Sequence, residues 1–392
     1  MKDLISALDI GSSKIKILIV KRKQKGTLEF FYKRKINSEG VKKGNVFEPK
    51  KLAKVLLALL KRVSEETKKQ IPPVFTNLGG SYVKTISSRG LVSVSRADQK
   101  ISPEDVERVL KAAQAINLGF NKEILEVLPQ EYIVDGEGEI QDPIGMRGLR
   151  LEVDALILVG LETYFENLKK SFLLSEIEVL DFISSPLSLS KAVLKEREMD
   201  IGTCLLNIGA ETTEMAVFEN GKLIHFTVLP IGGLFITNKI SIFLKTDFET
   251  AERIKLEYGT CIAKGKREKI EIEKEALSFT LSSLSKEIRE GYSKIFDEAK
   301  KELKKISKDK KLPAGIVLTG GGAKIKKIVD FAKQKFKLTA RIGKPKGILG
   351  LDEDPIFALS AGLILAGLEK EQEGEGPSFF SKIAKFFKNF LP

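Results

Sequence analysis

Two segments decide the fold of this chain: LDIGSSKIKILIV at residues 8–20 and LNIGAETTEMAVF at residues 206–218. Each reads as an apolar strand that ends in a carboxylate or carboxamide, then a glycine turn with hydroxyl side chains, then an alternating strand. Glycine permits a tight turn close to a ligand, and the N–H groups of such a turn can hold phosphate oxygens. One loop of this kind would also fit an ordinary hairpin. A third glycine segment, TGGGA at residues 319–323, makes two related half-domains closing on a nucleotide the better interpretation.

Length and composition indicate a globular protein with more than one domain. The chain has 392 residues, of which 42% are hydrophobic and 30% are charged, enough for two substantial cores. No apolar run reaches the ~18 residues of a membrane-spanning helix. Asp3 and Asp9 interrupt the first apolar stretch, so we expect no signal peptide. The two cysteines lack a metal or redox spacing, which favours a reducing cytoplasm.

The net charge of +13 raises the question of a nucleic-acid partner. The lysines, however, are scattered along the chain and mixed with glutamates. No arginine cluster with interleaved aromatic residues, of the kind that stacks bases, is present in the sequence. We therefore expect a solvated Lys/Glu surface and no nucleic-acid partner.

Strands alternate with helices in two repeated parts, which predicts an α/β fold with a central cleft. Strands are expected at 3–10, 15–20 and 28–36, followed by a helix at 49–70. A similar series returns at 203–208, 213–218 and 222–229, and 232–312 is expected to be mostly helical, with a long amphipathic stretch near 275–305. A strand (315–319), a helix (324–334), a strand (338–342) and a helix (355–368) follow. The segment 81–161 has a different character, with short alternating strands, among them 83–86 and 91–94, and one helix that Ser102 caps.

The glycine loops predict a phosphate site between the two halves. Ser12 and Ser13 can bind phosphate oxygens from one side, and Thr212 and Thr213 can do so from the other. Lys14 and Lys16 share one face of a strand, so either could neutralise the phosphates. Asp9 would hold a hydrated Mg²⁺, an ion that usually keeps several waters. The third loop would pass close to a sugar or base, and the helix start after it favours anions.

The three loops resemble those of the actin/Hsp70/hexokinase superfamily, which has two phosphate loops and an adenosine loop. The resemblance implies that ATP and Mg²⁺ are bound. It also implies that Glu252 and Lys255 flank the adenosine, although by themselves they read as a solvent-facing (i, i+3) pair. The expected ATP-binding residues are Gly11, Ser12, Ser13, Lys14, Lys16, Gly209, Glu211, Thr212, Thr213, Glu252, Lys255, Gly320, Gly321, Gly322 and Ala323.

Asn207 departs from the superfamily pattern, because many members carry a second Asp at this place. An amide cannot act as a general base and adds no negative charge towards Mg²⁺. Hydrolysis needs an oriented water and charge stabilisation. We therefore expect ATP binding with slow or absent hydrolysis. Asp9 and Asn207 are candidates near Mg²⁺ or water, and no catalytic residue is assigned.

Four further motifs lie in or near the segment 81–161: ISPEDV at 101–106, PQEYIVD at 129–135, DPIGM at 142–146 and LRLEV at 149–153. Taken alone, the last three indicate a strand, a turn and a strand, as in any structural hairpin. In detail they are similar to the inserted subdomain, called 1C, of the FtsA family of bacterial actin homologues. The resemblance covers nearly the whole chain. It implies subdomain 1A at 1–80 and 162–200, 1C at 81–161, 2A from 201–230, 2B at 231–312, and a C-terminal part of 2A and 1A at 313–368.

The tail is expected to contain a linker at 369–376 and an amphipathic helix at 377–392, PSFFSKIAKFFKNFLP. On a helical wheel the large apolar residues fill one arc, and lysine, serine and asparagine fill the opposite arc. Such a helix is too short to span a bilayer and suits its interface. A helix packed on its own domain, or in the groove of a partner protein, remains an alternative. The expected membrane contacts are Phe379, Phe380, Lys382, Ile383, Lys385, Phe386, Phe387, Lys388, Phe390 and Leu391.

Together with these features, the family resemblance implies an ATP-binding cell-division protein that polymerises on the inner face of the cytoplasmic membrane. The family resemblance implies that it tethers the FtsZ ring at the division site and that the C-terminal peptide of FtsZ binds residues 231–312. The basic residues expected on the long helix there are Lys286, Arg289, Lys294, Lys300 and Lys301. A PilM-like platform for type IV pilus assembly is the nearest alternative. A sugar or acetate kinase is the alternative from another class of protein.

Overall fold

The computed structural model describes residues 3–263, 269–272 and 277–372. The segment 377–392, with the ten side chains expected at the membrane, lies outside the described residues, as does the part of the expected linker at 373–376.

Each half of the molecule contributes five strands to a sheet. In the first half their order is β11-β6-β1-β2-β3, and in the second half it is β18-β17-β12-β13-β14, as part of a longer sheet. The strands of the first half are β1 (Leu4–Ile10), β2 (Lys14–Arg22), β3 (Leu28–Asn37), β6 (Val74–Leu78) and β11 (Val179–Ser184). Those of the second are β12 (Thr203–Ile208), β13 (Thr213–Glu219), β14 (Lys222–Leu229), β17 (Gly315–Thr319) and β18 (Ala340–Ile342).

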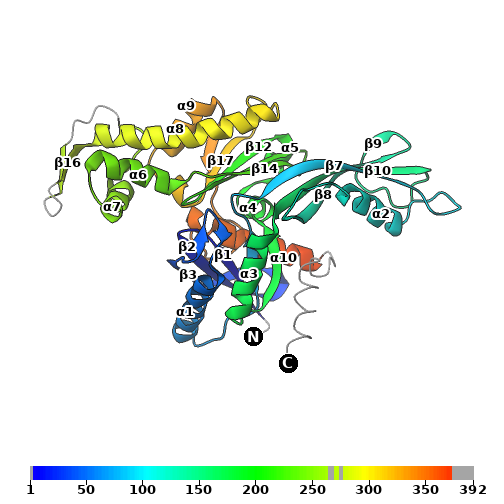
Figure 1. Cartoon of the computed structure of the whole chain (residues 1–392), viewed down its shortest axis with the longest axis horizontal. Coiled ribbons are helices and arrows are strands. Elements are labelled where there is room, and N and C mark those ends of the chain that lie inside the picture. Colours follow the sequence, from blue (N-terminus) through cyan, green and yellow to red (C-terminus); the bar gives the residue numbers. More distant parts are fainter. Residues whose placement is uncertain (1–2, 264–268, 273–276, 373–392) are drawn as a thin grey trace.

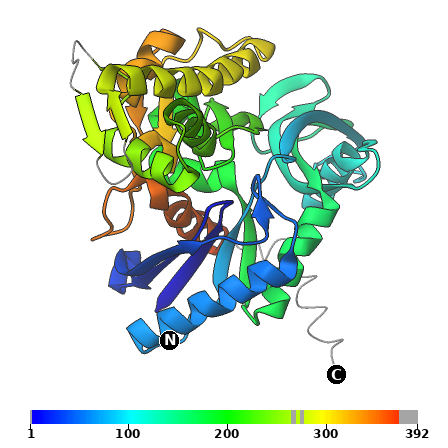
Figure 2. The same ribbon diagram turned by 60° about the vertical axis from the view of Figure 1, so that its left-hand side comes forward.

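The two sheets repeat one topology. In each, the first strand is antiparallel to the second and parallel to the fourth, in the pairs β1·β2 with β1·β6 and β12·β13 with β12·β17. The glycine turns also close alike, because Gly11 N–H donates to Lys14 O at 3.2 Å and Gly209 N–H donates to Thr212 O at 2.8 Å. Figures 1 and 2 show the first half below the second. The prediction of two duplicated α/β halves is therefore confirmed.

Helices of the first half cover its sheet: α1 (Pro49–Thr67), α3 (Glu162–Leu174), α4 (Ser185–Val193) and α10 (Ala358–Gln372). The apolar stripe of α1 is buried at Leu52, Leu56 and Leu59, as its helical period predicts. A Cβ on Gly362 of α10 would lie 1.9 Å from Ser188 O, so only glycine lets α10 pack this closely on α4. The small elements of this region are η1 (Gln24–Gly26), β4 (Val41–Lys42), β5 (Asn45–Val46), α5 (Glu196–Ile201) and η4 (Pro355–Phe357).

Helices of the second half pack on its sheet in the same way: α6 (Gly233–Leu244), α7 (Phe248–Tyr258), α8 (Leu281–Lys305) and α9 (Ile328–Phe336). Two expectations need correction. The stretch before α8 contains a hairpin of β15 (Lys269–Ile272) and β16 (Leu277–Thr280), so the long helix starts at Leu281 rather than near 275. The glycine loop continues into a 3-10 turn, η3 (Gly321–Lys324), and α9 begins only at Ile328.

The inserted subdomain contains β7 (Lys84–Ser93), α2 (Pro103–Gln114), β8 (Lys122–Val134), β9 (Glu137–Ile140) and β10 (Arg150–Leu161). The two short strands expected at 83–86 and 91–94 form the single strand β7, which pairs with β10 along its whole length. A Cβ on Gly90 would lie 2.2 Å from Val109 O, so α2 packs directly on the backbone of β7. Ser102 caps α2 as predicted, within a capping box that Asp105 completes.

The inserted subdomain also joins the sheet of the second half. Thr227 of β14 pairs with Lys84 of β7, which makes one nine-stranded sheet with the order β18-β17-β12-β13-β14-β7-β10-β8-β9. The Thr85 hydroxyl accepts from Phe226 N–H at 2.9 Å and donates to Phe226 O at 3.1 Å. Figure 1 shows the insert beside β14. A segment inserted into the first half therefore binds the edge of the second.

The helix α10 extends to Gln372, into the segment expected to be a linker. Lys370 Nζ lies 3.1 Å from a carboxylate oxygen of Glu126 and 3.9 Å from one of Asp181. Good helix-forming residues and these ion pairs keep 369–372 ordered, which corrects the expected start of the linker at 369.

Candidate functional site

The turn at Lys43 and Gly44 brings the two glycine loops together. Ser12 Oγ, in the first loop, accepts a hydrogen bond from Gly44 N–H at 2.7 Å. The carboxylate of Glu211, in the second loop, accepts from Lys43 N–H. The two expected phosphate loops therefore meet across one short turn of the first half.

Asp9 and Lys16 form an ion pair at the first loop. They lie opposite each other in the register of β1 and β2, and Asp9 is only 3% exposed. Lys14 is exposed and donates instead to the side-chain carbonyl of Asn37 on β3. Of the two candidate lysines, Lys16 is thus the one beside the Asp9 carboxylate.

Asn207 and Glu214 occupy the equivalent positions at the second loop. They are opposite in the register of β12 and β13, and Asn207 Nδ2 donates to Glu214 Oε2 at 2.8 Å. Burial raises the pKa of Glu214, and hydrogen bonds from Asn207 and Ser185 act against this rise. The sequence reasoning missed Glu214. The seven-residue spacing of Asp9 and Lys16, repeated in Asn207 and Glu214, could have revealed it.

The third glycine loop packs against the end of β12. Gly320 has φ +83°, and a Cβ there would lie 2.3 Å from Asn207 Oδ1. The hydroxyl of Tyr292, on α8, donates to Gly322 O at 2.6 Å, and Ala323 is buried. Gly321 is exposed. The loop is therefore held close to the second glycine loop, with Gly321 open to solvent.

Glu252 and Lys255 are not a solvent-facing pair. Lys255 is 7% exposed, and its Nζ donates to Glu252 Oε2 at 2.6 Å, to Thr237 Oγ1 at 2.7 Å and to Gly233 O at 3.2 Å. Burial lowers the pKa of Lys255, whereas Glu252 acts to raise it. Gly233 N–H in turn donates to Gly209 O at 2.9 Å, which connects this cluster to the second glycine turn. These three acceptors account for the three protons of the Lys255 ammonium group, so Lys255 holds this cluster together beside the second glycine loop.

Thr213 has a different place from the one expected for a phosphate ligand. Its side chain is fully buried, and its hydroxyl donates to Ile231 O at 2.8 Å. Gly209, Glu211 and Thr212 are partly exposed, as are Gly11, Ser12 and Ser13 in the first loop. Thr213 thus stabilises the loop from its buried side, and Gly209, Glu211 and Thr212 form the accessible surface.

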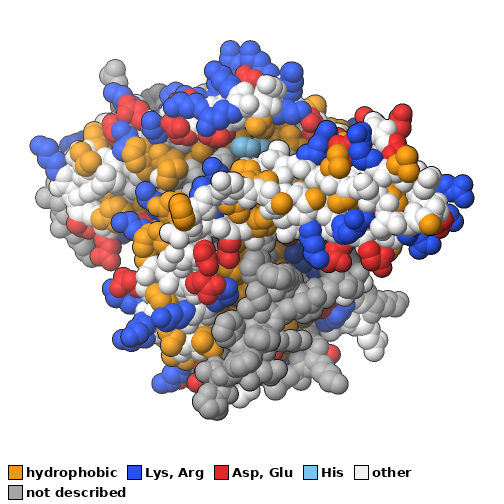
Figure 3. Space-filling view, turned by 45° about the vertical axis from the view of Figure 1, so that its right-hand side comes forward, with side chains coloured by type: hydrophobic (Ala, Val, Ile, Leu, Met, Phe, Trp, Pro, Cys, Tyr) orange, Lys and Arg blue, Asp and Glu red, His pale blue; other side chains and the backbone are white. Residues whose placement is uncertain are grey.

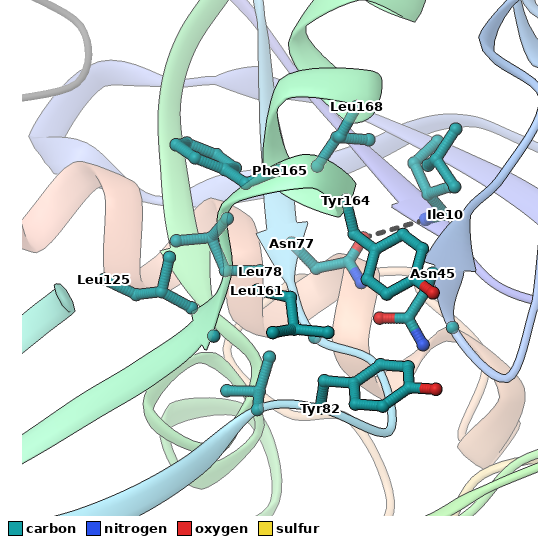
Figure 4. Close-up of a pocket in the computed structure, with 15 residues that line it drawn as sticks. Ile10, Asn45, Asn77, Leu78, Tyr82, Leu125, Leu161, Tyr164, Phe165 and Leu168 are labelled. Carbon is teal, nitrogen blue, oxygen red and sulfur yellow. Dashed lines mark hydrogen bonds between the residues drawn. The ribbon is translucent and has the colours of Figure 1, made fainter. Parts of the chain in front are cut away.

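A small cavity of about 30 Å³ lies behind the first loop, at the junction with the inserted subdomain (Figure 4). Asn77 Oδ1 accepts from Ile10 N–H at 2.8 Å, immediately before Gly11. Tyr82 stacks on Tyr164 with ring centroids 5.2 Å apart at the mouth of the cavity. Asn77, at the end of β6 just before the chain enters the insert, therefore holds the backbone of the first loop.

The surface intermixes charges of both signs. Figure 3 shows Lys and Arg side chains beside Asp and Glu side chains over the visible face, including the insert. Within the described ranges, no helix has both the length and the apolar character needed to cross a membrane.

Comparison with known families identifies the chain. A family model described as cell division protein FtsA matches residues 204–362, and one described as the SHS2 domain inserted in FtsA matches residues 80–159. The chain is 31% identical over 380 residues to cell division protein FtsA of Pseudomonas aeruginosa, which covers 95% of this chain and 91% of the relative. It is also 31% identical over 368 residues to the Bacillus subtilis protein, covering 92% and 83%.

Solved structures share the fold at lower identity. The PilM–PilN type IV pilus biogenesis complex superposes with a TM-score of 0.67 at 18% identity, covering 93% of this chain and 98% of the other. MreB5 of Spiroplasma citri, solved with ADP, gives a TM-score of 0.56 at 13% identity, covering 95% and 98%. These likenesses show an actin-like fold, and the identity to cell division proteins distinguishes the family. The chain belongs to the family of cell division protein FtsA, with an actin-like fold and the inserted domain of that family.

Proposed function

We propose that this chain binds ATP with Mg²⁺ between its two halves, assembles into filaments and tethers the FtsZ ring to the cytoplasmic face of the membrane at the division site. The observation that carries the nucleotide part is the pair of equivalent glycine turns, which residues 43–44 bring together. Family membership supports the role in division.

The residues present fit a magnesium nucleotide. Lys16 carries a positive charge beside the first loop for the phosphates, and Asp9 carries a carboxylate for a hydrated Mg²⁺. Lys255 and Glu252 lie beside the second loop at the side expected for adenosine. MreB5 of Spiroplasma citri, which shares the fold, has been solved with ADP and with AMPPNP. Bound ATP would supply phosphate charge in the cleft, and the chain's own groups would neutralise and orient it.

The membrane part of the proposal is argued from the sequence of 377–392. Each large apolar side chain that enters the interface contributes at most about 1.5–3 kcal/mol, and each lysine adds about 1 kcal/mol on an anionic leaflet. Part of this is lost because so short a helix is unstable alone in water. A single tail should therefore bind reversibly, and a filament with many tails should bind through avidity.

The FtsZ part concerns residues 231–312, where the structure favours α6 and α7 over α8. Lys294 and Lys301 of α8 both pair with Glu298, so their charge is partly neutralised. Ile242 and Leu256 are each 69% exposed. Exposed apolar side chains are the usual anchors of a bound peptide. Those of α6 and α7 are Phe235, Ile242, Phe243, Phe248 and Leu256.

Vesicle flotation tests the proposal. The full chain is compared with a chain that ends at Gln372, which keeps α10 intact, on vesicles containing anionic lipid, with and without Mg·ATP. We expect flotation only with the tail, and more of it with Mg·ATP. FtsZ should float only with the full chain, and Ile242→Asp should reduce this co-flotation more than Lys294→Glu does.

Equal flotation of the two chains would make the tail a packed or partner-binding helix and would contradict membrane tethering. In that case the tethering role fails, while the family of the chain stands. As a control for the apolar arc, Phe387→Asp should abolish flotation, whereas Asn389→Asp, on the polar arc, should weaken it only slightly.

A further inference from the structure

Glu214 places an acid opposite the neutral amide at the end of β12. The register of β12 and β13 sets it opposite Asn207, just as β1 and β2 set Lys16 opposite Asp9. In the first half the carboxylate is at the end of the first strand, and its partner is a cation. In the second half the end of the first strand carries a neutral amide, and the carboxylate is on the partner strand.

Glu214 also faces the first half of the molecule. A Cβ built on Gly79 would lie 2.9 Å from Glu214 Oε1 and 2.9 Å from Ser185 Oγ, and both Gly79 and Ser185 belong to the first half. Asp9 and Lys16 are near enough to act on Glu214 electrostatically, with opposite signs. The carboxylate thus lies between the halves, on the same side as the Asp9–Lys16 pair.

The polar groups beside Glu214 carry no charge. The amide of Asn207 donates to it, the nearby hydroxyl of Ser185 donates to Leu78 O at 3.0 Å, and Lys16 is paired with Asp9. Glu214 is partly exposed, so an ion can reach it. A carboxylate beside neutral groups and close to a second carboxylate is unfavourable, and a cation at this place would relieve it. Mg²⁺ takes one or two carboxylates and keeps several waters, so two acids facing it from opposite halves suit it well.

We propose that Glu214 is the second carboxylate of the nucleotide cleft and that it holds a water of the hydrated Mg²⁺ from the side of the second half. This inference rests on the proposed binding of Mg·ATP and names the residue that replaces the charge absent from Asn207. It also makes magnesium binding depend on both halves, so that the ion favours a closed cleft.

The first test is the magnesium dependence of ATP affinity in the full chain, measured by titration with a fluorescent ATP analogue in Mg²⁺ or in EDTA. Glu214→Gln keeps the shape and an acceptor for Asn207 but removes the charge. We expect it to weaken Mg·ATP binding by about tenfold and to leave the affinity in EDTA unchanged or slightly higher. Glu219→Gln, at the far end of β13 where the carboxylate pairs with Lys308, should keep the magnesium dependence of the wild-type chain.

The second test moves the negative charge from position 214 to position 207, at the end of β12. The double variant Asn207→Asp/Glu214→Gln should recover most of the magnesium dependence that Glu214→Gln loses. Binding of Mn²⁺ in the presence of ATP can be followed by its electron paramagnetic resonance signal. It should be tightest in the wild-type chain, weaker in the double variant and weakest in Glu214→Gln. This readout does not depend on hydrolysis.

Two results would overturn the inference in different ways. If the wild-type chain binds ATP and Glu214→Gln keeps its magnesium dependence, Glu214 only supports Asn207 and Ser185, and the proposed nucleotide function stands. If the wild-type chain binds no ATP at all, the proposed nucleotide function fails and the role of Glu214 fails with it.

Discussion

At the scale of single residues, Lys14 and Lys16 form a natural matched pair, since both lie on β2 and only one of them contacts Asp9. We expect Lys16→Met to weaken Mg·ATP binding tenfold or more, because a hydrogen bond to a charged group contributes about 1.5–3 kcal/mol. Lys14→Met should stay within about twofold, well under the 1.4 kcal/mol of a tenfold change. Calorimetric titration measures both affinities, after circular dichroism has shown that each variant is folded. A larger loss of affinity in Lys14→Met than in Lys16→Met would indicate that the phosphates lie beside Lys14 and Asn37 instead.

The partly buried carboxyl group of Glu123, on β8, should make the free energy of unfolding depend on pH. Burial raises its pKa to about 7, with Glu166 and Glu162 adding to the rise and Lys169 opposing it. The folded chain therefore keeps this proton between its unfolded pKa of 4.5 and about 7, where the unfolded chain has lost it. Stability accordingly falls as the pH rises through this window.

The variant Glu123→Gln removes that titration. We expect it to match the wild-type chain at pH 4.5 and to exceed its free energy of unfolding at pH 8 by about 1–2 kcal/mol, reduced from the full shift by solvent screening. Urea unfolding at both pH values measures the difference. A difference that does not vary with pH would show that Glu123 is solvated in the folded state.

At the scale of elements, the start of α2 depends on one buried carboxylate. Asp105 is fully buried and accepts hydrogen bonds from Ser102 N–H at 3.0 Å and Ser95 Oγ at 2.9 Å. Burial alone would raise the pKa of Asp105, but hydrogen bonds from Arg108, Ser102 and Ser95 outweigh this and hold it well below its usual range. This carboxylate therefore joins the helix to the segment that follows β7.

We expect Asp105→Ala to destabilise the chain by about 2–3 kcal/mol, since it leaves several donors without their acceptor. Glu107→Ala, on the exposed face of α2, should change stability by less than about 0.5 kcal/mol. Urea unfolding gives both values, and hydrogen exchange should show faster exchange at the start of α2 for Asp105→Ala only. Equal effects of the two substitutions would mean that packing on β7, rather than the cap, fixes this helix.

Several elements could be predicted from the sequence because local rules determine them. The strands expected at 203–208, 213–218 and 222–229 agree with β12, β13 and β14 to within one residue, since alternation and the Asn220–Gly221 turn are local signals. The length of β7 and the hairpin before α8 depend on pairing with other strands, which a single sequence does not show. The burial of Lys255 and the contact of Glu214 with the first half are likewise tertiary. The loops and most charged residues of the candidate site were thus predictable, but the burial of Lys255 and the place of Glu214 were not.

At the scale of the whole molecule, the insert connects the two halves. Its chain enters through Gly79 and Gly80, with Gly80 at φ +109°, and β10 leads directly into α3 of the first half. Its sheet, however, is continuous with β14 of the second half. A rotation that closes the cleft must therefore break the contact of β7 with β14 or turn the insert at its glycine hinge. Glycine bends at little energetic cost, so the hinge is the part that should yield.

We expect the insert to move with the second half when Mg·ATP binds. Spin labels at Ser93→Cys and Lys304→Cys should keep their distance, whereas labels at Ser93→Cys and Lys61→Cys should change theirs. All three positions are exposed, while the native Cys204 and Cys261 are buried, so labelling can be selective. Pulsed electron–electron resonance with and without Mg·ATP measures both distances.

The variant Thr85→Val provides the control for this movement, because it removes both hydrogen bonds to Phe226 and nearly preserves the shape of the side chain. Loss of two such bonds weakens the contact by about 1–3 kcal/mol, so the distance between positions 93 and 304 should become broadly distributed. If the wild-type insert instead kept its distance to position 61 and changed that to position 304, the break would lie between β7 and β14. The insert would then belong mechanically to the first half, and the state of the nucleotide would reach it through Asn77 and the first glycine loop rather than through the sheet.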